Sequence, residues 1–169
     1  ARWMAAAALA AAVALVAVQG PASAQAAAEK KDEYQPQVGQ SGKDVVWVPT
    51  PDALVERMLR MANVTARDYV IDLGSGDGRT VIAAAKKFGA RSMGIEYNPD
   101  MVELSNRNAA KEGVAGKARF VKADIFETDF SKATVITMYL LPALNIKLRP
   151  KILDLRPGTR IVAHAFNME

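Results

Sequence analysis

The chain has 169 residues, which is enough for one domain. Half of the residues are hydrophobic and 24% are charged, a composition that excludes a disordered or collagen-like protein. The absence of cysteine excludes disulfides, thiolate metal sites and a cysteine nucleophile, and the single histidine, His164, argues against a zinc site of several histidines. The net charge of +4 comes from basic residues scattered among acids, which indicates solubility.

The N-terminus has the layout of a secretory signal peptide. An apolar run at 4–18 follows Arg2, Gly20-Pro21 interrupts it, and small residues suited to cleavage come next. The run is too short for a good membrane span. We therefore expect residues 1–24 to be a signal peptide or an N-terminal anchor.

Two consequences follow for the organisation of the chain. A cleaved signal would make the protein exported or periplasmic with no stable membrane span, whereas an uncleaved leader or a wrongly assigned start would leave it membrane-anchored or cytoplasmic. Residues 25–43 show no hydrophobic period and are predicted to be a flexible linker. The folded domain is then expected at residues 44–169.

The predicted elements begin with an extended run at 45–48. Thr50 is expected to cap the first helix, with Pro51 at its first position. Strands and helices then alternate, and Pro150 is expected to break the last helix into two pieces. We expect strands at residues 69–73, 91–97, 118–123, 134–140 and 159–166. We expect helices at residues 51–62, 79–88, 98–113 and 141–155.

This alternation predicts a doubly wound, Rossmann-like α/β domain, with a parallel sheet and helices on both faces. The strands are almost continuously apolar, as is typical of a sheet buried on both sides. Such sheets bind ligands beyond the carboxyl ends of their strands, where the strand order reverses. Candidate functional residues are therefore sought at the strand ends.

The strongest motif follows the first predicted strand, where Asp72 leads into Gly74-Ser75-Gly76-Asp77-Gly78. Glycines there permit a tight turn and a close approach of ligand to backbone. The spacing Gly-x-Gly-x-Gly differs from the dinucleotide fingerprint, because Arg79 follows Gly78. The two acids beside the helix start favour a cationic or zwitterionic ligand over a pyrophosphate. A turn that only connects strand and helix is the alternative.

Two further acids end the next two predicted strands. Glu96 is placed to accept hydrogen bonds from ribose hydroxyls, and Asp124 to accept from an adenine amino group, with the Ile125 backbone beside it. Alone, each could be an ordinary surface or capping carboxylate. Their succession at neighbouring strand ends favours a nucleoside site.

Together these residues resemble the motifs of class I S-adenosylmethionine-dependent methyltransferases. The resemblance covers the chain from about Val45 onward. It implies S-adenosylmethionine (SAM) as the cofactor and methyl transfer as the reaction, with no metal. It assigns the methionine part and ribose to the glycine loop and Glu96, and adenine to Asp124 with Ile125. The expected cofactor-binding residues are Pro49, Thr50, Asp72, Gly74, Ser75, Gly76, Asp77, Gly78, Glu96, Tyr97, Asp124 and Ile125.

A narrower resemblance adds an expected acceptor. Residues 48–51, 72–79, 81–82, 94–96 and 98–99 are similar to those of a group of small methyltransferases. The group includes the mitochondrial protein-lysine methyltransferases acting on the ATP synthase c-subunit and on the adenine nucleotide translocator. In those enzymes the Pro-Thr segment lies near the cofactor. The expected acceptor is a protein or a small molecule, with a protein lysine amine as the leading candidate.

The end of the fourth predicted strand faces the acceptor in class I methyltransferases. Residues 137–142 lack the Asn/Asp-Pro-Pro-Tyr type motif of enzymes that methylate amino groups of nucleic acids, and the chain has no basic stripe interleaved with aromatics. No nucleic-acid partner is therefore expected. Tyr139 is the candidate catalytic residue, orienting an amine by its hydroxyl or ring face, with a pocket-wall role as the alternative. His164 is expected to be a packed side chain.

The family sheet normally has seven strands, so the last two are expected to be lacking. That would leave an edge beside the fifth strand which a partner or second copy could cover, giving a homo-oligomer. Two alternatives to a methyltransferase stay open at this point. One is a non-catalytic nucleoside- or partner-binding module on a degenerate fold, and the other is an NAD(P)-dependent oxidoreductase.

Overall fold

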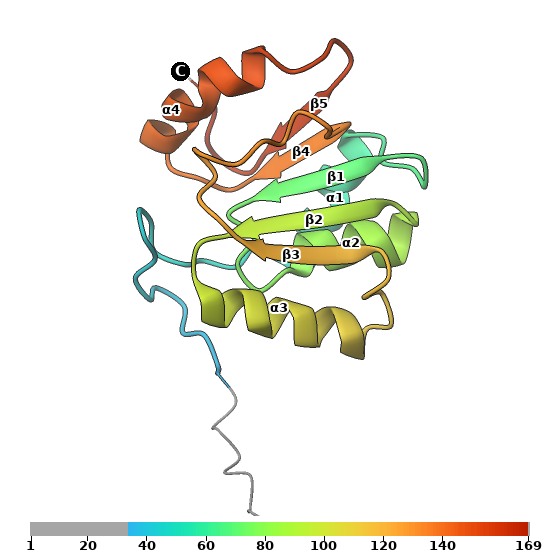
Figure 1. Cartoon of the computed structure of the whole chain (residues 1–169), viewed down its shortest axis with the longest axis vertical. Coiled ribbons are helices and arrows are strands. Elements are labelled where there is room, and N and C mark those ends of the chain that lie inside the picture. Colours follow the sequence, from blue (N-terminus) through green and yellow to red (C-terminus); the bar gives the residue numbers. More distant parts are fainter. Residues whose placement is uncertain (1–33, 169) are drawn as a thin grey trace, which may run out of the picture. The chain divides into compact units, whose positions relative to one another are not determined.

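Five parallel strands form the sheet of this protein, in the order β3-β2-β1-β4-β5 (Figure 1). Their bounds are β1 Tyr69–Leu73, β2 Arg91–Glu96, β3 Ala118–Lys122, β4 Val135–Met138 and β5 Arg160–Ala163. The order reverses between β1 and β4, and Asp72 pairs in register with Gly94 of β2 and Thr137 of β4. The predicted doubly wound fold is confirmed in this computed structural model, which describes residues 34–168.

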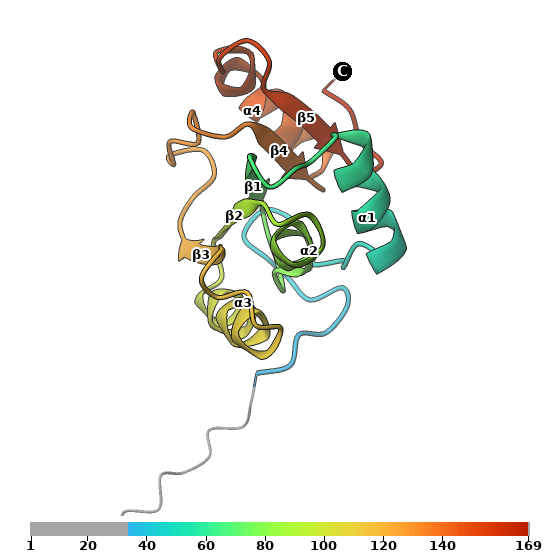
Figure 2. The same cartoon turned by 90° about the vertical axis from the view of Figure 1, so that its right-hand side faces the viewer.

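Helices cover both faces of the sheet, as Figure 2 shows. Their bounds are α1 Asp52–Met61, α2 Arg79–Phe88, α3 Pro99–Lys111 and α4 Pro142–Leu153. Apolar residues of α1, α2 and α3 pack on one face, and those of α4 pack on the other. Asn98 caps α3 as expected, because its side chain accepts hydrogen bonds from the backbone of Asp100 and Met101.

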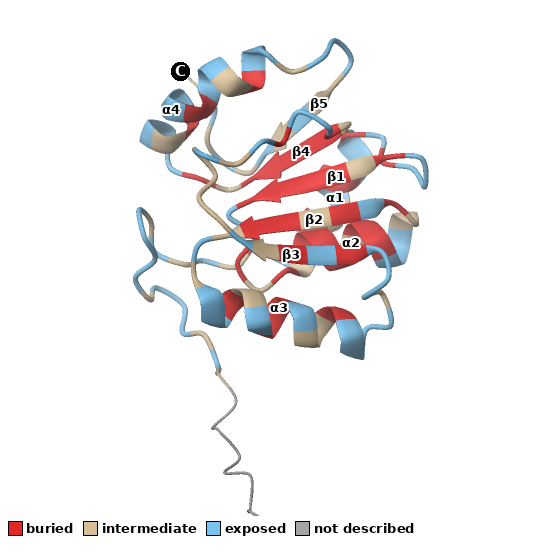
Figure 3. Cartoon of the chain, in the orientation of Figure 1, coloured by how far each residue is buried: buried red, intermediate tan, exposed pale blue. Residues whose placement is uncertain are grey.

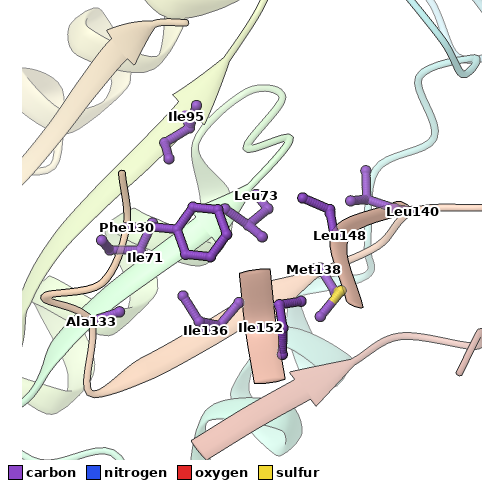
Figure 4. Packing of buried hydrophobic residues seen from close by; sticks show 10 residues of the cluster. All are labelled: Ile71, Leu73, Ile95, Phe130, Ala133, Ile136, Met138, Leu140, Leu148 and Ile152. Atoms are coloured by element: carbon purple, nitrogen blue, oxygen red, sulfur yellow. The ribbon is translucent and has the colours of Figure 1, made fainter. Parts of the chain in front are cut away.

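The core of the face under α4 is built around Phe130, which comes from the segment before β4 (Figure 4). Leu148 and Ile152 of α4 pack in the same cluster as Ile71 and Ile136 of the central strands. Figure 3 shows that β1 and β4 are the most continuously buried strands. Their carboxyl ends are therefore held in a rigid layer.

Two details of the helices differ from expectation. Thr50 does not cap α1, because the cap position is Pro51 in extended conformation and no side chain bonds to the helix start. Pro150 does not divide α4, which is continuous from Pro142 to Leu153. Proline costs one backbone hydrogen bond, but it lies in the last turn, and buried Leu148 and Ile152 hold the helix on either side of it.

The domain begins earlier than the expected boundary at 44. The compact unit starts at Tyr34, so it includes residues 34–43. The extended run at 45–48 forms only an isolated bridge between Ser41 and Val46. The predicted signal or anchor, and the linker before Tyr34, lie outside the described residues. Within 34–168, no helix is long and apolar enough to cross a membrane.

An ionic network ties the first residues of β5 to the loop before β1. Asp68 is buried and accepts hydrogen bonds from Thr134 Oγ1 at 2.8 Å and the Thr65 backbone at 2.7 Å, and it pairs with Arg160. Arg160 also donates to the carbonyl oxygens of Ala62 and Asn63. Burial opposes ionisation of Asp68, but the hydrogen bonds and the Arg160 charge lower its pKa.

We expect Asp68→Asn to lower the free energy of unfolding by about 1–3 kcal/mol at neutral pH, since a buried charge-assisted network loses its anion. Because the pKa of Asp68 is lowered, its stabilising contribution is lost as the pH falls through the folded-state pKa. The difference in unfolding free energy between wild type and Asp68→Asn should therefore shrink in acid. Urea unfolding of both proteins at neutral and at acidic pH measures this difference, with exposed Asp154→Asn as the control. Equal stability of Asp68→Asn and wild type at neutral pH would contradict it.

Candidate active site

A cavity of about 270 Å³ lies at the carboxyl ends of β1, β2, β3 and β4, on both sides of the point where the strand order reverses. Among the residues predicted to bind cofactor or acceptor, those that line the cavity are Pro49, Thr50, Asp72, Gly74, Ser75, Gly76, Asp77, Glu96, Tyr97, Asp124, Ile125 and Tyr139. Gly78 does not line it. The structure thus brings together residues from strand ends that are far apart in sequence.

Gly78 has a packing role at the start of α2. Its φ is +83°, a conformation that L side chains rarely adopt. A Cβ there would also lie 2.7 Å from the Phe120 ring and 2.9 Å from Ser105 Cβ. The third glycine therefore lets α2 pack closely on β3 and α3, and through this packing it holds the glycine loop in place.

The glycine loop, residues 74–78, is fixed by hydrogen bonds on several sides. Backbone N–H groups of Gly74 and Ser75 donate to the Ile95 carbonyl of β2. From α3, Ser105 Oγ donates to the Gly76 carbonyl at 2.9 Å and Asn108 Nδ2 to the Asp77 carbonyl at 3.1 Å. The loop is therefore preorganised before any ligand arrives.

Glu96 joins the second strand to this loop. Its Oε2 accepts from the Gly76 N–H and its Oε1 from the Asn98 N–H, both at 2.9 Å. A carboxylate can accept about four hydrogen bonds, so each oxygen retains capacity for another donor. Glu96 lines the cavity, and this remaining acceptor capacity suits a ligand group with two hydroxyls.

Asp72 is buried at the floor of the cavity. Burial raises its pKa to about 7, and the nearby charges of Glu96 and Asp77 add to this, against hydrogen bonds from Thr137 and Thr80. The Thr137 hydroxyl donates to Oδ1 at 2.5 Å. Three carboxyl groups, those of Asp72, Asp77 and Glu96, line this part of the cavity with the single guanidinium of Arg79, and this excess of acids favours a cationic ligand group.

Asp77 is engaged by a neighbour rather than directed freely at a ligand. The Arg79 guanidinium donates to both of its oxygens, with Nη2 to Oδ2 at 2.6 Å. The same guanidinium donates through Nη1 to the Thr50 carbonyl at 3.0 Å. Arg79 therefore ties the glycine loop to the Pro-Thr segment, a role that its position in the sequence did not reveal.

Asp124 meets a hairpin from the N-terminal side of the domain. We call residues 39–49 the strap. Lys43 of the strap forms an ion pair with Asp124 Oδ2, while Oδ1 accepts from the Phe126 N–H at 2.8 Å. The hydrogen bond from Lys43 lowers the pKa of Asp124. Lys43 Nζ also lies 4.8 Å from the ring centroid of Tyr97.

Tyr139 stands in an aromatic cluster at the ends of β4 and β5. Its ring centroid lies 4.0 Å from that of His164 and 6.3 Å from that of Phe166. His164 Nδ1 is 3.4 Å from Thr50 Oγ1, so the Pro-Thr segment reaches this cluster too. Tyr139 and Phe166 line the cavity. Tyr139 follows β4 and Asp124 follows β3, and β2 and β1 lie between these two strands in the sheet.

Several residues of the site were not singled out from the sequence. They are Lys43, Trp47, Arg79, Ser105, Asn108, Thr137 and Phe166. Trp47 was the easiest of these to find, since an aromatic residue just before the Pro-Thr segment is a local signal. The others act through partners that are distant in sequence, and no spacing rule identifies them.

The residues present fit a nucleoside sulfonium such as SAM. Ser75 lines the cavity, but its buried Oγ lies 2.4 Å from the place that a Cβ on Gly94 of β2 would occupy, so this side chain packs against the sheet. The acids around Asp72 suit ammonium and sulfonium charges, and Glu96 suits ribose. Among the described residues, no group of three or more Asp, Glu or His side chains is arranged to hold a metal ion.

Comparison with known proteins agrees with this geometry. Residues 72–169 match the model of the ANTKMT methyltransferase domain family. A protein-lysine N-methyltransferase of Saccharolobus islandicus is 47% identical over 126 residues, which cover 73% of this chain and 78% of that protein. The human ATP synthase C-subunit lysine N-methyltransferase is 36% identical over 121 residues, and the match spans 71% of this chain but about half (51%) of that protein.

A solved structure supports the cofactor. The crystal structure of an RNA methyltransferase from Salinibacter ruber, in complex with S-adenosylhomocysteine, is 52% identical, with a TM-score of 0.70, and covers 72% of this chain and 80% of that chain. Its bound molecule is the product that SAM leaves after methyl transfer. SAM is therefore the cofactor, and the chain belongs to the ANTKMT methyltransferase domain family.

Proposed function

We propose that this protein transfers the methyl group of SAM to the side-chain amine of a lysine in another protein. The observation that carries the acceptor is the aromatic cluster of Tyr139, His164 and Phe166 at the β4 and β5 end of the cavity. Aromatic faces attract ammonium groups and exclude water. The names of the 47% and 36% identical relatives support a lysine acceptor.

The proposed cofactor placement uses the whole rim of strand ends. Gly74, Ser75 and Gly76 hold the methionine part, Glu96 the ribose, and Asp124 with Ile125 the adenine. Bound SAM supplies a methyl group that is already activated on a sulfonium. The buried carboxyl of Asp72 faces this cationic end and stabilises its charge.

The chain's own contribution is chiefly positioning and the exclusion of water. The lysine ammonium that enters must first lose its proton to solvent, because only the neutral amine accepts a methyl group, and removal from water lowers the pKa of a buried amine. Tyr139 can hold that amine against its ring face, and Thr50 and His164 fix the ring. Alignment of this kind can account for a large part of a rate enhancement in a displacement that needs no further activation.

The acceptor class is tested with radioactive SAM and two substrate pools. Purified protein is incubated with a cell extract, and the extract is then digested with protease or with ribonuclease. We expect label that survives ribonuclease and is found on lysine by mass spectrometry. Label on RNA would assign the protein to the class named for the Salinibacter ruber structure and would refute the lysine proposal.

We expect Tyr139→Ala to lower kcat/KM for the protein acceptor about ten-fold or more, because one aromatic face is lost from the amine site. Tyr139→Phe should keep most of that activity. Affinity for S-adenosylhomocysteine should change less than about two-fold, since Tyr139 lies away from the adenine and ribose residues. Tyr69→Phe, at the opposite end of β1 from the cavity, is the control. Full activity of Tyr139→Ala would refute a role in holding the amine.

A further inference from the structure

The strap is a tight hairpin whose tip carries Lys43. The Gly39 N–H donates to the Trp47 carbonyl at 2.8 Å, the Trp47 N–H to the Gln40 carbonyl at 2.9 Å, and the Gly42 N–H to the Val45 carbonyl at 2.8 Å. Figure 1 shows this segment beside the carboxyl ends of the strands. The hairpin therefore presents a short turn, with one cation at its tip, to the adenine side of the cavity.

Lys43 takes the position at Asp124 that an adenine amino group would need. Both Asp124 oxygens are engaged, Oδ1 by the Phe126 N–H and Oδ2 by Lys43. The Lys43 ammonium also lies over the ring of Tyr97. Lys43 binds the Asp124 oxygen that the backbone leaves open, so its ammonium competes for Oδ2 with any amino group that donates there.

Trp47 makes a second contact from the other end of the strap. Its Nε1 lies 2.6 Å from the place that a Cβ on Gly76 would occupy, so the indole rests on the glycine loop. One hairpin therefore touches both the adenine residue and the methionine-binding loop. A movement of Lys43 is expected to displace Trp47 as well, because the hairpin hydrogen bonds join the two parts of the strap.

We propose that Lys43 is a displaceable internal competitor for the adenine subsite, so that cofactor binding requires the tip of the strap to release Asp124. The ion pair is partly exposed, with 35% of the Lys43 side chain and 16% of the Asp124 side chain accessible. Pairs of this kind are weak, so the cofactor can displace the ammonium. The proposal rests on the adenine placement given above and is independent of the identity of the methyl acceptor.

The test is a calorimetric titration of the full chain with S-adenosylhomocysteine, which carries no net charge near neutral pH. Lys43→Met should bind about two- to five-fold more tightly than wild type, as expected for loss of an exposed ion pair that must break. Lys43→Arg should bind as wild type does. Lys122→Met, which removes an exposed lysine at the end of β3, is the charge-matched control and should also bind as wild type does.

Salt gives a second readout that a general effect on folding would not produce. Raising the salt concentration from about 50 mM to about 500 mM screens the ion pair, so binding to wild type and Lys122→Met should tighten by a similar two- to five-fold. Binding to Lys43→Met should not change. Weaker binding by Lys43→Met would show that Lys43 holds the cofactor, and equal binding with equal salt dependence would show no competition. Either result overturns the proposal.

Trp47 reports the same event by fluorescence. The chain has two tryptophans, and a Trp3→Phe background leaves Trp47 as the emitter. We expect S-adenosylhomocysteine to shift the Trp47 emission and change its quenching by iodide. Unchanged emission at saturation would overturn the coupled movement of the strap. Absence of binding by every variant would overturn both the adenine placement and this proposal, whereas failure to methylate lysine would leave the titration unaffected.

Discussion

Replacing Glu96 with alanine should weaken binding of S-adenosylhomocysteine by about 2–4 kcal/mol, or roughly thirty- to a thousand-fold, because hydrogen bonds from two ribose hydroxyls to a carboxylate are lost together. The same change frees the N–H groups of Gly76 and Asn98, which Glu96 holds at 2.9 Å. The glycine loop loses part of its fixed geometry as well. The measurement is a calorimetric titration of the variant beside wild type.

Two controls separate the ribose contact from the support of the loop. Glu103→Ala removes an exposed carboxylate of α3 that pairs with Arg107, and it should bind S-adenosylhomocysteine as wild type does. Urea unfolding of Glu96→Ala shows how much stability the loop contacts contribute. A folded Glu96→Ala that binds the ligand with wild-type affinity would disprove the placement of ribose at Glu96.

The second large effect concerns the charge of Asp72. Its pKa is about 7 in the folded protein, against an ordinary value of 3.8. Between these values the folded state holds a proton that the unfolded chain has lost, so the folding free energy becomes less favourable as the pH rises. The loss of folding stability caused by ionising Asp72 is absent below the ordinary pKa and complete above pH 7. It is on the order of 4 kcal/mol.

Asp72→Asn should therefore be more stable than wild type at pH 8 by up to that order and similar to it in acid. The amide keeps an acceptor for the Thr137 hydroxyl and removes the buried charge. Urea unfolding across the pH range measures the difference. If wild type and Asp72→Asn kept a constant difference from pH 4 to pH 8, ionisation of Asp72 would not be the cause of the cost.

The same group should link cofactor affinity to pH. An ammonium and a sulfonium near Asp72 favour its ionised form, so SAM binding should release a proton below pH 7. Affinity for SAM should rise by up to about ten-fold per pH unit toward pH 7 and level off above it. Asp72→Asn should bind SAM weakly and without this rise. A flat profile for wild type would contradict the prediction.

Asp72→Asn is expected to stabilise the fold and to weaken the binding of SAM, and both effects have one physical reason. A buried carboxylate next to Glu96 and Asp77 is unfavourable until a cation neutralises it. The proposed cofactor site thus contains a charge that destabilises the fold until a cation neutralises it. Buried groups whose pKa is shifted in this way are characteristic of functional sites.

The sequence by itself determined the order of strands and helices and the place of the chemistry. Apolar runs separated by helical patterns predict a parallel sheet, and the acids Asp72, Glu96 and Asp124 at successive strand ends predict a nucleoside site at one edge. These signals are local, because each depends on a short run of residues and on the rule that parallel strands align their carboxyl ends. The fold class and the family resemblance were confirmed for this reason.

The tertiary structure alone decided which side chains meet. Lys43 reaches Asp124 across 81 residues, Thr137 reaches Asp72 across 65, and Arg79 turns back to Thr50. The start of the domain at Tyr34 and the unbroken α4 also depend on packing that local propensity does not encode. A contact between distant segments depends on strand register and loop packing, and these are set by the whole core and not by the residues on either side of the contact.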